Sequence, residues 1–208
     1  MSIQAHETRP VNAIQVTAKC PRCGKSSILE ALAQDIVVIG DTACGQRRCP
    51  DPDCHAHMFV VVSKSKVLAS YPPARIDFDP RNIPAPVLAP FEEALNCLAS
   101  GYHTASAIMI RRTLESICDE RGAKGKDLKD RISDLASKVI IPGELLDGMD
   151  ELRILGNDAA HVNAISYLSI SEEELAIAAE FAKEILKALY QYAALLDRLR
   201  ALKKPASA

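Results

Sequence analysis

Two cysteine pairs near the start of the chain restrict its fold more strongly than any other feature of the sequence. The first pair, Cys20 and Cys23, lies in the run CPRCG, and the second, Cys49 and Cys54, lies in the run CPDPDC after 25 intervening residues. Two thiolates on a tight turn supply half of a tetrahedral metal site, and a second pair completes it. The glycine and the prolines favour such turns. The spacing therefore predicts a zinc-ribbon-like β module with a four-cysteine site.

We expect a structural Zn²⁺ at this site, because protein sulfurs would fill all four positions and leave none for a catalytic water. Cys44 and His57 are close enough in the sequence to replace one of the four ligands. The alternative to a metal site is that some of these cysteines are small buried apolar side chains. Five of the seven cysteines crowd into the first 54 residues, which indicates metal or redox use.

A proline-rich segment separates this module from the rest of the chain. Residues 71–90 contain six of the twelve prolines, which lack a backbone donor and keep the preceding residue extended. We therefore expect a zinc-ribbon-like module at 1–70, a linker at 71–90 and an α-helical bundle at 91–208. Within the module, β-rich runs at 36–39 and 58–62 predict strands.

The sequence after the linker has a helical period almost without a break. Apolar spacing predicts five helices, so the fold class is α+β and mostly α. Their expected ranges are 88–100, 104–121, 127–138, 144–161 and 171–202.

The last predicted helix has the clearest pattern. Ser171 and Glu174 form a capping box, and an apolar stripe follows at alternating steps of three and four residues. At about 1.5 Å per residue the helix would extend roughly 45 Å, longer than the bundle needs. We therefore expect part of the stripe to pack on a second subunit in a homodimer, although a seam inside one chain is the alternative. The stripe consists of Leu175, Ala178, Ala182, Ile185, Leu189, Tyr192, Leu196 and Leu199.

The helix expected at 104–121 is apolar over most of its circumference and should be central in the bundle. Charges on such a helix have to be paired. Glu115 lies four residues after Arg111 and three after Arg112, so its carboxylate can pair with either. This group is either a structural brace or the lining of a phosphate-binding cleft.

The helix expected at 144–161 carries a second polar group. Steps of four residues place Arg153, Asn157 and His161 along one helix face. Such a row suits phosphodiester chemistry: His161 could move a proton, Arg153 could offset charge on a phosphorane, and Asn157 could orient either group. The alternative is a structural histidine beside an asparagine cap.

The polar residues on these two predicted helices resemble the motifs of a known family. The chain resembles the bacterial family called domain of unknown function 4145. The resemblance rests on the pattern Arg-Arg-x-x-Glu at 111–115 and the run LRILGNDAAH at 152–161, which follow the two cysteine pairs. That family is similar to the HEPN superfamily (higher eukaryotes and prokaryotes nucleotide-binding), whose helical domains often dimerise and include metal-independent ribonucleases of phage defence, toxin modules and restriction systems. The usual motif there is an arginine, a polar residue, three variable residues and a histidine, which implies roles for Asn157 and His161.

The sequence departs from this motif at Gly156, where the arginine would stand. Arg153 lies one turn earlier and could reach the same groove, or the site is a relic of an ancestral nuclease. The first hypothesis is therefore a metal-independent endoribonuclease with Arg153, Asn157 and His161 as catalytic residues. The second is a non-catalytic regulatory or adaptor module that binds a partner protein or nucleic acid.

Composition limits the partners. The formal net charge of -2 gives no overall attraction to nucleic acid, and 4% aromatic residues without tryptophan offer few stacking platforms for RNA. The sequence has no apolar stretch long enough to span a bilayer, and its first ten residues lack the layout of a secretory signal. We expect a cytoplasmic protein that does not enter the membrane.

Overall fold

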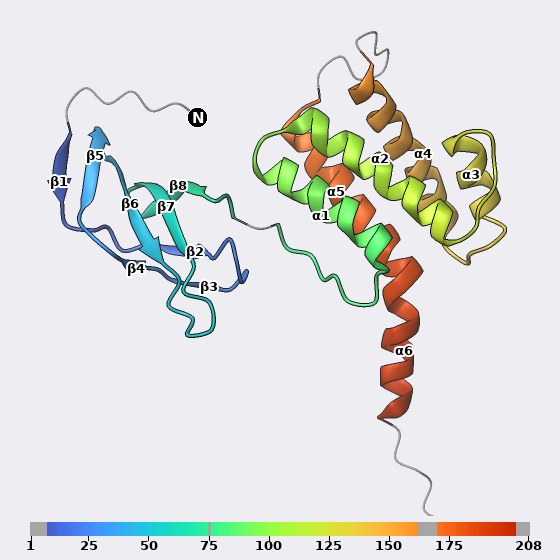
Figure 1. Cartoon of the computed structure of the whole chain (residues 1–208), viewed down its shortest axis with the longest axis horizontal. Coiled ribbons are helices and arrows are strands. Elements are labelled where there is room, and N and C mark those ends of the chain that lie inside the picture. The colour runs from blue at the N-terminus through green and yellow to red at the C-terminus, as the bar shows by residue number, and fades with distance from the viewer. Residues whose placement is uncertain (1–7, 75, 162–169, 203–208) are drawn as a thin grey trace, which may run out of the picture. The chain divides into compact units, whose positions relative to one another are not determined.

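The computed structural model describes residues 8–74, 76–161 and 170–202. The chain folds into two compact units, Met1–Asp77 and Phe78–Ala208. The first unit contains the described strands and the second contains the described helices, as Figure 1 shows. The predicted fold class, a small β module followed by a helical bundle, is confirmed.

The β module is antiparallel throughout its described strands. A six-stranded sheet has the order β1-β5-β6-β7-β8, with β4 paired to β6, and β2 and β3 form a separate hairpin. Both predicted strands exist, although each is longer than its apolar run. The strands are β1 (Arg9–Val11), β2 (Thr17–Lys19), β3 (Ser26–Ile28), β4 (Glu30–Ala31), β5 (Asp35–Ile39), β6 (Thr42–Arg48), β7 (His57–Ser63) and β8 (Lys66–Tyr71).

The core of the β module includes the cysteines. Alternate residues of β7, such as Met58, Val60 and Val62, are buried on one side of the sheet, as the period of two in a strand requires. Three of the four predicted metal ligands belong to the same buried cluster. Its members are Val16, Cys20, Leu29, Ala43, Cys49, Cys54, Met58, Val60 and Val62. A metal at the cysteines would therefore be part of the module's hydrophobic core.

A buried ion pair ties the sheet to the segment before β2. Arg47 donates from Nη1 and Nη2 to the two carboxylate oxygens of Asp35, each at 2.7 Å, and both side chains are fully buried. The Ile14 backbone closes the arrangement, because its N–H donates to Asp35 and its carbonyl accepts from Arg47. Burial opposes ionisation of Asp35, but the hydrogen bonds from Arg47 and Ile14 outweigh it and lower the pKa of this carboxyl.

The helical unit begins inside the proline-rich segment. Helix α1 starts at Ala85, because Pro84 is its N-cap residue and Pro86 lies in the first turn, where no backbone donor is needed. None of the described helices is long and apolar enough to cross a membrane. The helices are α1 (Ala85–Ala99), α2 (His103–Glu120), α3 (Leu128–Leu135), α4 (Gly143–Ala160), α5 (Glu172–Leu186), the π-helix η1 (Lys187–Gln191) and α6 (Tyr192–Ala201).

Helix α2 is central, as its composition predicts. It packs against α1, α3, α4 and α5 (Figure 1). Its buried side chains include Ile110, Leu114 and Ile117. This arrangement places the residues of α2 next to those of α4.

The last predicted helix differs from the expected single rod. The capping box of Ser171 and Glu174 is confirmed, and the stripe is buried along α5. The π-helix then inserts an extra residue into the turn, which shifts the helix faces. Consequently Tyr190 is buried, whereas Tyr192 and the later stripe residues are exposed, and α6 has no buried residue.

Candidate functional site

The four predicted metal ligands come from two turns of the β module. Cys20 and Cys23 lie in the loop that joins β2 to β3, and Cys49 and Cys54 lie in the loop that joins β6 to β7. In the first loop, Gly24 has a φ of 73°, which favours glycine, and its N–H donates to the Cys20 carbonyl at 3.0 Å. Each loop therefore presents a pair of sulfurs from a tight turn.

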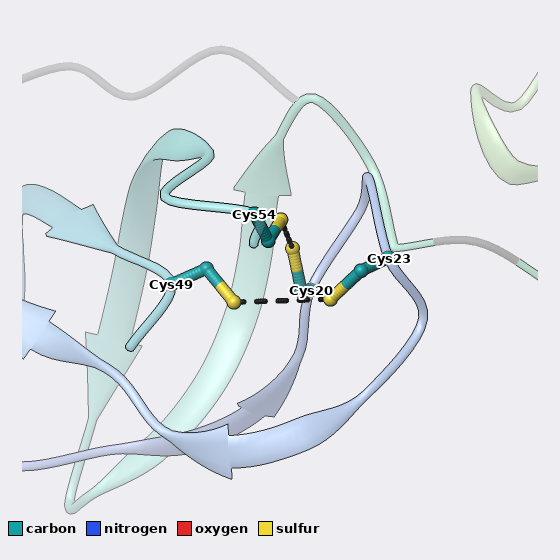
Figure 2. A group of neighbouring side chains, drawn as sticks. All are labelled: Cys20, Cys23, Cys49 and Cys54. Carbon is teal, nitrogen blue, oxygen red and sulfur yellow. Dashed lines mark hydrogen bonds between the residues drawn. The ribbon is translucent and has the colours of Figure 1, made fainter. Parts of the chain in front are cut away.

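The sulfurs of the four cysteines converge. Figure 2 shows the four side chains directed toward one another, with Cys20 close to Cys54 and Cys23 close to Cys49. These two Sγ–Sγ distances are 3.7 and 3.8 Å, and all four ligand atoms lie within 4.8 Å of one another. A tetrahedral zinc ion with Zn–S bonds of about 2.3 Å would hold its sulfurs about 3.8 Å apart. The cluster could therefore hold a structural metal ion such as zinc.

The surroundings of the cluster favour thiolate at one position. Burial raises the pKa of Cys20, but backbone hydrogen bonds from Cys23 and Arg22 and contacts with Cys23 and Cys54 outweigh it and lower that pKa to about 7. Burial raises the pKa of Cys49 to about 12. A cation would be needed to hold the buried Cys49 as a thiolate at neutral pH.

The two alternative ligands lie outside the cluster. Cys44 is in the middle of β6 and His57 begins β7, and neither joins the group of metal-ligating side chains found among the described residues. Cys118 lies on α2, fully buried, and burial raises its pKa to about 11. It is a core residue of the helical unit.

The structure places the predicted catalytic residues along and just beyond α4. Arg153 and Asn157 are half-buried, and Arg153 Nε donates to Asp150 Oδ1 at 2.6 Å. That hydrogen bond lowers the pKa of Asp150 and raises the pKa of Arg153. His161 is the exposed C-cap residue, with an extended backbone (φ −123°, ψ 129°), so it follows the last helical turn instead of continuing the row.

Arg111 packs directly on the residue where the motif arginine would stand. A Cβ atom added at Gly156 would lie 2.4 Å from Arg111 Cβ and 3.0 Å from the Ala107 carbonyl oxygen. Only a residue without a side chain permits this contact between α2 and α4. The sequence marks Gly156 as a departure from the motif but gives no sign that an arginine from another helix occupies the space beside it.

The pairing predicted within α2 is present. Arg111 Nη1 donates to Glu115 Oε1 at 2.6 Å, and Arg112 Nη1 donates to Glu115 Oε2 at 3.3 Å. The side chain of Arg111 is 32% exposed and that of Arg112 is 65% exposed. The two arginines thus share a carboxylate, but Arg112 lies mostly in solvent whereas Arg111 lies against α4.

Comparison with known proteins identifies the helical part of the chain. The family model Domain of unknown function (DUF4145) matches residues 92–203, which is more than half of the chain. No curated protein and no solved structure gives a significant match. The matched range begins in α1 and includes both Arg111 and the residues of α4. The chain therefore belongs to the DUF4145 family, with a four-cysteine β module preceding the family domain.

Proposed function

We propose that this chain is a HEPN-like protein that acts on RNA as a metal-independent endoribonuclease, in phage defence or in a toxin or restriction system. The observation that carries the proposal is the contact of Arg111 with Gly156. Through it, two motifs that are separated by about forty residues in the sequence meet at one place in the fold. Arg111 of α2 thereby lies against Gly156, the residue before Asn157, although position 156 itself carries no side chain.

In the proposed reaction, the 2′-oxygen of a ribose attacks the phosphorus of the adjacent phosphodiester in the same RNA strand. His161 would take the proton from the ribose 2′-hydroxyl, whose oxygen forms a bond to phosphorus while the bond to the 5′-oxygen breaks. The leaving 5′-oxygen receives a proton, and the products are a 2′,3′-cyclic phosphate and a 5′-hydroxyl. Arg111 and Arg153 would offset the charge of the phosphorane, and Asn157 would orient the phosphate.

We propose that the reacting protein is a homodimer. Helix α6 leaves several large apolar side chains in solvent, among them Leu196, Leu199 and Leu202, which are 45%, 62% and 79% exposed. A second copy of the chain would cover them and would bring a second His161 as the acid that protonates the leaving group.

We also propose that the four-cysteine cluster binds Zn²⁺ as a structural ion. The support is the agreement of two sulfur–sulfur distances with a tetrahedral zinc site and the presence of four protein ligands. Thiolates of this kind persist in a reducing compartment, which favours the cytoplasm.

A non-catalytic adaptor is the second candidate function. The observation that favours it is the ion pair of Arg153 with Asp150, which occupies the arginine of α4. In that case the β module and the bundle would bind a partner protein or nucleic acid without cleavage.

One experiment separates the two candidates. Purified wild-type protein, His161→Ala and His57→Ala would be incubated with total RNA in the presence of a chelator of Mg²⁺, and the ends of the products would be identified. An endoribonuclease loses about 10² to 10⁴ in rate with His161→Ala and keeps its rate with His57→Ala, since His57 is an exposed residue of the β module. Equal cleavage by all three proteins, or RNA binding without cleavage, would exclude His161 as the acid–base group.

A further inference from the structure

A pocket lies where the last helix changes from α5 to α6. It has a volume of about 600 Å³, and its lining comes from the segment before α1, from η1 and from α6. This volume lies in the range of small-molecule sites, which is about 300 to 1,000 Å³. The pocket belongs entirely to the helical unit and contains none of the residues assigned above to the RNA site.

The π-helix η1 supplies Lys187 and Gln191 to the lining of the pocket. Tyr190 of η1 is buried and donates from its hydroxyl to Glu120 at 2.8 Å, and the Arg121 guanidinium lies 4.6 Å from the centre of its ring. Arg121 also donates to the Leu189 carbonyl at 2.9 Å. The end of α2 therefore holds the inner side of η1, so the π-turn is a stabilised feature of the bundle. Such turns occur frequently at functional sites.

The segment before α1 forms another wall of the pocket. Gln191 of η1 donates from Nε2 to the backbone carbonyls of Asp79, at 2.7 Å, and Arg81, at 3.2 Å. These two bonds join residues more than one hundred positions apart in the sequence, and Figure 1 shows the segment passing the junction of α5 and α6. The wall is thus attached to the π-helix by its backbone.

The pocket carries more positive than negative charge. Among the described residues, the lining cations are Arg81, Lys187 and Arg198, and the lining carboxylate is that of Asp79. Arg81 pairs with Asp79 at 2.6 Å, and Lys187 pairs with Glu184 at 2.6 Å. Arg198 forms no ion pair within the described ranges 8–74, 76–161 and 170–202. Arg81 mainly, and Arg198 to a smaller extent, lower the pKa of Asp79, so Arg198 acts on this carboxylate without a direct ion pair and keeps guanidinium donors for an anion.

An apolar surface lies beside these cations. Tyr192 and Leu195 line the pocket and are 54% and 59% exposed. They lie three residues apart on α6, and Arg198 follows three residues later, so the three side chains share one face of the helix. An apolar wall next to a free guanidinium suits a ligand that has a flat apolar part and an anionic part.

We propose that this pocket binds a small organic phosphate, whose phosphate group contacts Arg198 and Lys187 and whose planar ring lies on Tyr192 and Leu195. The bound ligand bridges α6 to the segment at 79–82. Helix α6 buries no side chain in the bundle, so the ligand also reduces its motion. This binding is independent of the endoribonuclease activity proposed above.

Isothermal titration calorimetry of the full chain tests the proposal, with AMP and inorganic phosphate as the two probes. Wild-type protein should bind AMP saturably and at least about tenfold more tightly than phosphate. Arg198→Glu should weaken AMP binding by about tenfold or more, since it removes one charge-assisted hydrogen bond and adds a repulsive charge. Arg200→Glu is the matched control, because it makes the same charge change two residues away, outside the pocket lining.

A second variant tests the apolar wall. Tyr192→Ala should weaken AMP binding while leaving phosphate binding within about twofold of the wild type, because the ring contacts only the planar part of the ligand. Amide hydrogen exchange in α6 should slow when AMP is bound. Absence of saturable AMP binding, equal affinity for AMP and phosphate, or equal losses in Arg198→Glu and Arg200→Glu would each overturn the proposal.

Discussion

Arg111 of α2 lies so close to the backbone of α4 at Gly156 that a methyl group there would be 2.4 Å from its Cβ atom. The contact joins the two helices that carry the proposed RNA site. Any side chain at position 156 would displace Arg111, so the contact requires the glycine. In the proposed RNA site, the cation at this place would then come from α2 instead of α4.

Gly156→Ala should destabilise the helical unit. Separation of α2 from α4 costs about 2 to 3 kcal/mol, and alanine returns about 1 kcal/mol as a better helix former, so we expect a net loss of about 1 to 2 kcal/mol. Urea unfolding followed by circular dichroism measures it. Gly143→Ala is the control, because a Cβ at the first residue of α4 meets nothing within 4 Å. An unchanged or higher stability of Gly156→Ala would show that the two helices can separate freely.

Arg111→Gln and Arg112→Gln should differ in activity. Both arginines donate to Glu115, but Arg111 lies against Gly156 of α4 whereas the side chain of Arg112 is 65% exposed. Loss of a group that stabilises transition-state charge costs about 10² to 10³ in rate, so Arg111→Gln should lower RNA cleavage by about 10²-fold. Arg112→Gln should stay within about threefold. Melting temperatures of both variants separate this effect from unfolding, and equal rates in the two variants would remove Arg111 from the site.

Cys49→Ser should abolish metal binding. We expect one zinc ion per wild-type chain by elemental analysis and almost none in the variant, because a serine hydroxyl is a poor ligand for zinc. The variant's β module should also unfold at a lower temperature, since metal binding contributes to folding. Cys44→Ser should keep its zinc. Wild-type protein that contains no metal and melts at the same temperature with and without chelator would contradict the zinc proposal.

Leu199→Asp should convert the proposed dimer to a monomer. A charge in a buried apolar contact between subunits is strongly unfavourable. Ile177→Asp provides a closely matched control, because Ile177 on α5 is 63% exposed and Leu199 on α6 is 62% exposed. Light scattering after size-exclusion chromatography gives the mass of each. A monomeric wild type, or dissociation by both variants alike, would exclude α6 as the dimer surface.

The features that could be predicted from sequence are those with a local cause. Cys20 and Cys23 are separated by two residues on one turn, and Cys49 and Cys54 form a second close pair, so spacing alone indicates a common site. The capping box of Ser171 and Glu174 is likewise a contact within one helical turn. The boundaries of α2 and α4 follow from apolar periodicity.

The features that could not be predicted depend on contacts between distant residues. Arg47 and Asp35 pair across neighbouring strands, and the period of a strand does not say which buried position holds a charge. Arg111 reaches Gly156 only because α2 and α4 pack together. The π-helix was missed because the apolar stripe continues through it at the same spacing, whereas its extra residue is stabilised by Arg121 and Glu120 from another helix.

The π-helix determines the direction in which the side chains of α6 face. An α-helix turns about 100° per residue, so one residue more or less between 187 and 191 rotates everything after it by that amount. The number of residues in η1 therefore determines which side of α6 faces the rest of the bundle. Homologues that keep every side chain of α6 but lose one residue there would present a different face to the segment at 79–82.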